Sequence, residues 1–159
     1  MSAMAAAPTT VHGIDVHRVE EAVRAAERRT SGEVRVAVAR FYFWGDVRGA
    51  AERAFARLHM ERTRERNGVL IFIAPWRRRF AVLGDDGIHQ KVPPTFWQEI
   101  ADAMAADLRR GDLTTGIVRG VTAVGEKLAT AFPYDPARDR NELPDSVALP
   151  GRGDPKPTS

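Results

Sequence analysis

The sequence contains no cysteine. Disulfide bonds, thiolate metal sites and cysteine nucleophiles are therefore excluded, so any metal would have to be bound by oxygen or histidine ligands. No stretch is long and apolar enough to span a membrane, and the first ten residues lack the basic start and apolar centre of a secretory signal. From the absence of both segments we expect a cytoplasmic protein.

Several common functional motifs are also missing. The chain has no Gly-x-Ser-x-Gly motif, no phosphate-binding glycine loop and no His-Glu-x-x-His motif. The usual sequence signatures of serine hydrolases, nucleotide-binding enzymes and zinc proteases are therefore absent.

A strong charge of one sign is lacking as well. The chain has 24 basic and 21 acidic residues, a formal net charge of +3, and the pI is high because arginine dominates the basic residues. Arg77-Arg78-Arg79 is a purely basic cluster. Such a cluster at a hairpin tip is compatible either with a solvated turn or with a phosphate-binding patch, so nucleic-acid binding is a minor alternative.

The hydrophobic periodicity predicts four helices and three strands. Asp15 and Asp112 are suitable N-caps for the first and last helices. The predicted elements are a helix from Asp15 to Arg29, a strand opened by Glu33, a helix from Ala51 to Arg64, hairpin strands at Val69–Ala74 and Phe80–Leu83, a helix from Pro94 to Gly111, and a helix from Asp112 to Phe132.

The length of 159 residues favours one folded domain. We place this α/β domain at residues 14–134, after a flexible N-terminus at residues 1–13. Prolines and polar residues dominate the remainder. They predict an extended segment packed on the domain at residues 135–147 and a disordered tail at residues 148–159.

The order of elements predicts a central mixed β-sheet with helices on both faces, an α/β/α sandwich. The strand-helix-strand unit predicts a right-handed crossover between parallel strands, and the hairpin adds an antiparallel third strand. Val69–Ala74 is apolar at every position, which places this strand in the centre of the sheet.

Acidic and amide side chains should gather at one edge of this sheet. Strand direction brings the starts of the first two strands and the end of the third together, so Glu33, Asn67 and the Asp85-Asp86 pair converge. Oxygen ligands beside glycines suit calcium or magnesium, although Gly84-Asp85-Asp86-Gly87 also has the composition of a simple polar turn. His89 lies within reach of this edge, either as a ligand or as a surface or capping residue.

The chain resembles the TPM domain family, in particular its short soluble bacterial members. The resemblance covers roughly residues 14 to 147. It rests on the order and spacing of Thr30-Ser31-Gly32-Glu33, Asn67-Gly68-Val69-Leu70, Gly84-Asp85-Asp86-Gly87-Ile88-His89 with Lys91-Val92, Gly111-Asp112, and Asn141-Glu142-Leu143-Pro144-Asp145.

This resemblance implies an α/β sandwich, consistent with the predicted topology. Some family members are described as binding calcium or magnesium in loops at the sheet edge, which points to Glu33, Asp85 and Asp86 as metal ligands here. Some plant relatives are described as acid phosphatases. Bacterial members are often encoded beside LemA-like membrane proteins, so the resemblance implies a LemA-like protein as a partner.

Two main hypotheses follow. In the first, the protein is a non-enzymatic binding or adaptor domain whose acidic edge holds calcium or magnesium. In the second, it is a weak metal-assisted phosphatase in which Asp85 or Asp86 holds magnesium, Glu33 positions the metal or a water, and His89 is the general acid. Phosphoryl transfer also needs positive charge, which Lys91, or Arg138 or Arg140 from the tail, would supply.

Overall fold

A computed structural model of the chain describes residues 10–39, 45–137, 143–144 and 146–149. The elements in these residues are, in order, β1 (Thr10–Val11), β2 (Ile14–Asp15), α1 (Val16–Glu27), β3 (Glu33–Val38), α2 (Val47–Arg57), β4 (Gly68–Ala74), the 3-10 turn η1 (Pro75–Arg77), β5 (Arg79–Gly84), α3 (Asp86–His89), α4 (Phe96–Arg109) and α5 (Leu113–Ala131).

The main sheet has the strand order β3-β4-β5. Strand β3 runs parallel to β4, with Glu33 opposite Gly68, and β5 runs antiparallel to β4, with Gly84 opposite Val69. All seven residues of β4 are buried. The predicted central position of this strand and both predicted strand directions are confirmed.

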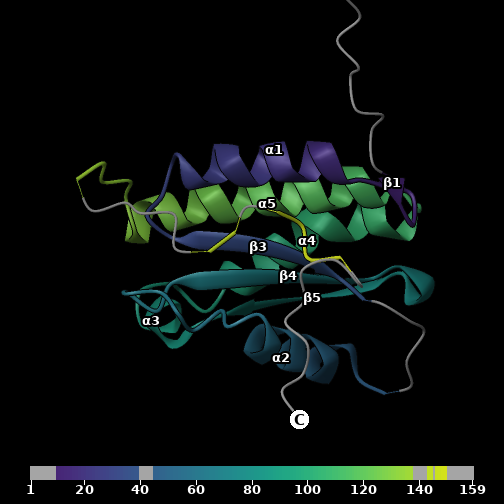
Figure 1. Cartoon of the computed structure of the whole chain (residues 1–159), viewed down its shortest axis with the longest axis horizontal. Helices are drawn as coiled ribbons and strands as arrows, with labels where there is room; N and C mark the ends of the chain where they lie inside the picture. The colour runs from purple at the N-terminus through teal and green to yellow at the C-terminus, as the bar shows by residue number, and fades with distance from the viewer. Residues whose placement is uncertain (1–9, 40–44, 138–142, 145, 150–159) are drawn as a thin grey trace, which may run out of the picture.

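Helices cover both faces of the sheet (Figure 1). The alternation of side chains along β4 sends Val69, Ile71 and Ile73 into the core beneath α1, α4 and α5, and sends the residues between them into a smaller core under α2. Each face of β4 is apolar because each is covered by helices. The predicted α/β/α architecture is confirmed.

The long helix α5 packs unusually close to its neighbours, α1 and α4. A methyl group added at Gly120 would lie 2.6 Å from Met104 Cγ in α4, and one added at Gly125 would lie 2.8 Å from the Cβ of Ala26 in α1. These glycines cost helix propensity, but they allow a spacing that a larger residue would prevent.

The helix ends show where sequence patterns are reliable. Asp15 and Asp112 cap α1 and α5 as predicted, each accepting a backbone hydrogen bond from the first turn. Helix α2 differs from the prediction: it begins at Val47, because Asp46 caps it, and ends at Arg57 rather than Arg64. Beyond Arg57 the chain turns through His59, whose φ of 54° is left-handed and cannot continue a helix.

Segments outside the central domain contact it. Thr10 and Val11 pair with β2, although residues 1–13 were predicted to be flexible. Ala148, at the start of the predicted tail, exchanges backbone hydrogen bonds with Val36 and Val38 of β3. The rest of the predicted tail, residues 150–159, lies outside the described residues, as do residues 1–9. No helix in the described residues has both the length and the apolar character needed to cross a membrane.

Candidate binding site at the end of β5

The backbone convergence predicted at one sheet edge is present. The N–H of Glu33 donates to Asn67 O at 3.2 Å, and the N–H of Asp85 donates to Gly68 O at 3.0 Å. The starts of β3 and β4 and the end of β5 therefore share one edge. The Asn67 side chain, which is buried, donates to Ser31 O and to a Glu65 carboxylate oxygen, so it fixes the approach to β4.

Asp85 is held by an arginine that the sequence did not single out. Arg66 donates from Nε to Asp85 Oδ2 at 2.6 Å and from Nη2 to Asp85 Oδ1 at 2.9 Å. This fork pairs both carboxylate oxygens with one planar guanidinium, the strongest common form of ion pair between side chains. Oδ1 also accepts the N–H of Asp86 at 2.8 Å, which caps the short helix α3. The Asp85 side chain is only 5% exposed.

Asp86 completes the charge balance around Arg66. Its side chain is 86% exposed, and its Oδ2 lies 3.9 Å from Arg66 Nη2. The hydrogen bond and the negative charge of Asp85 are the main reasons that the pKa of Arg66 is raised above its usual value, with a smaller contribution from Asp86. The two carboxylates thus already share a cation supplied by the chain itself.

Backbone geometry presents Arg66 to Asp85. Arg66 has a left-handed φ of 52°. The backbone oxygens of Glu65 and Arg66 lie so close to Gly87 that a methyl group there would be 2.6 Å from Arg66 O and nearer still to Glu65 O. Only glycine fits this contact between the loop and α3, so Gly87 keeps the two halves of the ion pair together.

Glu33 is separated from the two aspartates by β4. Glu33 and Asp85 flank opposite sides of this central strand, so their backbones stand two strand spacings apart, about 9–10 Å. The Glu33 side chain is also buried. Within the described ranges, no group of three or more histidine, aspartate and glutamate side chains is arranged to hold a metal ion. The assignment of Glu33, Asp85 and Asp86 as metal ligands therefore stays a prediction.

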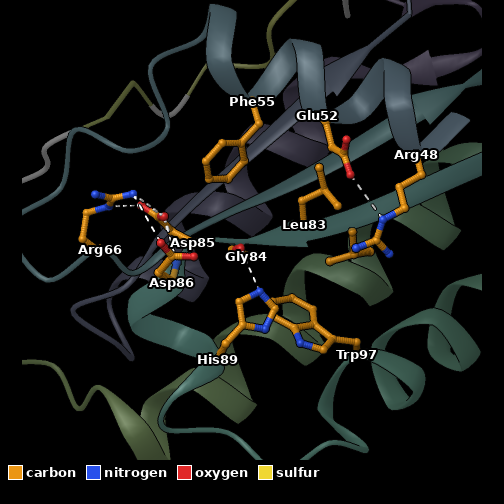
Figure 2. Close-up of a pocket in the computed structure, with 11 residues that line it drawn as sticks. Arg48, Glu52, Phe55, Arg66, Leu83, Gly84, Asp85, Asp86, His89 and Trp97 are labelled. Carbon is orange, nitrogen blue, oxygen red and sulfur yellow. Dashed lines mark hydrogen bonds and ion pairs between the residues drawn. The ribbon is translucent and has the colours of Figure 1, made fainter.

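A pocket of about 390 Å³ opens beside the ion pair (Figure 2). Arg48, Glu52 and Phe55 of α2 form one wall, Leu83 and Gly84 of β5 lie between the walls, and His89 and Trp97 form the other wall.

The predicted histidine lies within this pocket. His89 Nε2 lies 3.2 Å from Gly84 O, and its ring centroid lies 5.3 Å from that of Trp97. A methyl group at Gly84 would come within 2.6 Å of Trp97 Cζ2, so this glycine makes room for the indole. The pocket thus combines three carboxylates, two arginines, an imidazole and apolar surface.

The sequence identified only part of this set. It singled out Asp85, Asp86 and His89, but Arg66 and Arg48 carried no signal because isolated arginines in arginine-rich segments are common. Lys91, the predicted source of positive charge, instead lies 4.6 Å from the centre of the Phe132 ring. Arg138 and Arg140 lie outside the described residues.

Comparisons with known proteins agree with this architecture. The chain is 32% identical to the BA42 protein of the psychrophilic bacterium Bizionia argentinensis, with a TM-score of 0.79 over 94% of this chain and 99% of that one. Two more distant domains share the fold. The N-terminal domain of the cg2496 protein of Corynebacterium glutamicum is 12% identical, with a TM-score of 0.57 over 75% of this chain and 74% of that one. The N-terminal domain of a P. gingivalis protein is 20% identical, with a TM-score of 0.56 over 70% of this chain and 72% of that one.

No curated protein sequence matches this one. The model of the TPM domain family, however, matches residues 12–127, which are most of the chain and include all of the main sheet. The chain therefore belongs to the TPM domain family.

Proposed function

We propose that this protein is a binding domain, not an enzyme, and that Asp85 and Asp86 take up a calcium or magnesium ion in exchange for Arg66. The observation that carries the proposal is the fork between Arg66 and Asp85. In this fork the guanidinium of Arg66 lies beside both carboxylates. The same two carboxylates would provide most of the electrostatic attraction for a divalent cation. The ion and the guanidinium would therefore compete.

The exposure of the side chains makes such an exchange feasible. Arg66 is half exposed and Asp86 is mostly exposed, so the guanidinium can turn toward solvent while an ion approaches from the same side. Asp85 would then exchange one cationic partner for another and would not be left buried without one, which avoids the large cost of an unpaired buried charge. Cation binding would thereby release the loop that carries Arg66.

The experiment is calorimetric titration of chelator-treated protein with calcium and then with magnesium. We expect saturable binding by the native chain, loss of binding in Asp85→Asn/Asp86→Asn, and tighter binding in Arg66→Gln, because this variant removes the competing charge. Arg62→Gln, a neighbouring exposed arginine, is the matched control for the change in net charge and should bind as the native chain does. If Arg66→Gln binds the ion more weakly than Arg62→Gln, the exchange proposal fails.

Glu33→Gln separates the two candidate ligand sets. If only Asp85 and Asp86 bind the ion, this variant should leave the affinity unchanged. A large loss of affinity in a variant that melts like the native chain would instead support the three-residue site predicted from the sequence. Thermal melts of every variant accompany the titrations, because Glu33 and Asp85 are buried.

A second candidate function is a weak metal-assisted phosphatase. The observation in its favour is that Arg48, Arg66 and His89 line the same pocket as the aspartates, which provides the positive charge and the proton donor that phosphoryl transfer needs. Hydrolysis of a chromogenic phosphate ester with magnesium tests this. Turnover should disappear in Asp85→Asn/Asp86→Asn. Turnover that survives in this variant would assign the activity to a contaminant.

Three other expectations remain proposals of lower priority. A cytoplasmic location and a LemA-like membrane protein as partner rest on the sequence and on the family resemblance. Nucleic-acid binding through Arg77, Arg78 and Arg79 would show an affinity that falls steeply with added salt.

A further inference from the structure

Strand β5 is an edge strand. The main sheet ends with it, and no segment in the described part of the chain pairs with its outer side. Exposed strand edges present backbone donors and acceptors that readily pair with another chain, and proteins usually block them. In the described residues the outer side of β5 is instead the floor of a groove.

The hydrogen-bond pattern shows which backbone groups face outward. Asp85 donates to Gly68 O, and in an antiparallel pair the bonded positions alternate. Leu83, Ala81 and Arg79 therefore direct their N–H and C=O groups toward β4. The N–H and C=O groups of Phe80, Val82 and Gly84 point to the open edge. The C=O of Gly84 has a partner there in the ring of His89.

The groove along this edge has two walls. One wall is α2, toward which Ala81 and Leu83 project, and the other is α4, toward which Phe80 and Val82 project. Besides the pocket beside the ion pair, a second hollow of about 610 Å³ extends along β5 to Arg78 and Arg79 and reaches Ala105, Leu108 and Arg109 of α4. The two hollows share Arg48, Val82 and Leu83, so they adjoin along the strand edge, and together they are called the channel below.

The charge along this channel is uneven. At the start of β5 the side chains of Arg78, Arg79 and Arg109 are exposed, and none of them lies within ion-pair distance of a carboxylate among the residues the structure describes. The one acidic side chain lining that end, Asp46, already accepts a hydrogen bond as the N-cap of α2. At the other end Phe55, Leu83 and Trp97 offer apolar surface, and the carboxylates there, on Glu52, Asp85 and Asp86, lie beside Arg48 and Arg66 (Figure 2).

We propose that β5 accepts an extended, acidic segment of a partner protein as a fourth strand of the sheet. The segment would pair its backbone with the outward groups of Phe80 and Val82, which is the mode of recognition known as β-augmentation. Its carboxylates would lie beside Arg78, Arg79 and Arg109, and an apolar side chain near its other end would contact Phe55 and Trp97. This inference goes beyond cation uptake and does not depend on it.

The experiment uses the full chain and a pair of dye-labelled peptides. In each peptide one end is acidic and the other end alternates valine and threonine and carries a phenylalanine. The two peptides have this sequence in opposite orders, because the groove does not determine whether the added strand runs parallel or antiparallel to β5. Fluorescence polarisation measures binding. We expect one of them to bind with an affinity that falls as salt is added, and a version with lysine in place of the acidic residues to bind at least about tenfold more weakly.

Hydrogen exchange distinguishes an added strand from loose electrostatic attachment. The amides of Phe80 and Val82 should exchange more slowly when the acidic peptide is bound, because they acquire acceptors. The amides of Ala81 and Leu83, which already face β4, should change little.

Two pairs of variants test the backbone and the charge separately. Val82→Pro removes an outward N–H without breaking the ladder to β4, so it should abolish binding, while Val82→Ala keeps the N–H and should bind. Arg78→Glu/Arg79→Glu should weaken binding at least about tenfold. Arg18→Glu/Arg28→Glu makes the same change in charge at exposed positions of α1 and its end, and should have little effect.

The outcomes that would overturn the proposal are specific. Binding that leaves the exchange of Phe80 and Val82 unchanged, or that survives in both Val82→Pro and the Arg78 and Arg79 double variant, would exclude strand addition. Protection of the same two amides by self-association, seen as a dimer in sedimentation, would replace the partner with a second copy of this chain. Asp85→Asn/Asp86→Asn leaves Arg78, Arg79 and Arg109 in place. This variant should therefore lose cation binding but still bind the acidic peptide, so the two proposals can fail separately.

Discussion

Gly87 should be among the least replaceable residues of the candidate site. In Gly87→Ala the added methyl group would lie 2.6 Å from Arg66 O and closer still to Glu65 O, whereas real methyl carbons almost never approach within 3.0 Å of another heavy atom. Both obstacles are backbone oxygens, so no side-chain rotation relieves the clash. Either the loop or α3 must therefore shift by roughly 1 Å. Such overpacking typically lowers the free energy of unfolding by about 1–3 kcal/mol.

The assay is thermal unfolding followed by circular dichroism. In a chain of this size each kcal/mol lowers Tm by about 2–4 °C, so Gly87→Ala should melt several degrees below the native protein. Gly49→Ala is the matched control, since the same change in helix α2 meets only the end of the Arg53 side chain at 3.5 Å and should leave Tm unchanged or raise it. If Gly87→Ala melts with the native protein, the close contact between the loop and α3 is refuted.

Two further predictions concern the helices. Met104 is fully buried against Gly120 of α5, so Met104→Ala should lower the free energy of unfolding by about 2–5 kcal/mol in urea titrations, and a loss below 1 kcal/mol would contradict the packing. The hydrogen bonds that Asp112 accepts from Thr115 hold the pKa of this carboxyl in the folded protein below its usual value. The ionised Asp112 therefore stabilises the fold fully above the pKa that it has in the unfolded chain, and this stabilisation is lost as the pH falls through the lowered pKa of the folded protein. Asp112→Asn keeps the cap but does not titrate, and should therefore lose less stability than the native chain between pH 6 and pH 3; an equal loss would contradict this role.

The sheet could be predicted from the sequence because its signals are repeated along whole segments. Val69–Ala74 is apolar at every position, and a strand with two buried faces has to be central. The parallel and antiparallel neighbours then follow from the single helix between the first two strands and the short turn between the last two. Many residues contribute to each of these inferences, so no single exception changes the result.

The ion pair could not be predicted because it depends on a few backbone angles. Arg66 reaches Asp85 only because the chain after α2 turns at His59 and then approaches β4 with Arg66 itself in a left-handed conformation. Arg66 does not belong to the residue types that favour this conformation, and although histidine is one of them, a single histidine does not by itself predict a turn. An apolar spacing that continued beyond Arg57 therefore predicted a longer helix, which would have placed Arg66 elsewhere.

The central position of β4 also separates the residues that the topology brings to one edge. Strand direction determines only that Glu33, Asn67 and Asp85 lie at the same edge of the sheet, whereas a shared ion requires their side-chain oxygens to lie within one coordination shell. Since β4 stands between β3 and β5, the carboxylates of Glu33 and Asp85 begin two strands apart. The neighbours that Asp85 does have, Arg66 and Asp86, come from the loop before β4 and from its own turn. For a three-stranded sheet, convergence at an edge therefore predicts a functional surface better than it predicts a ligand set.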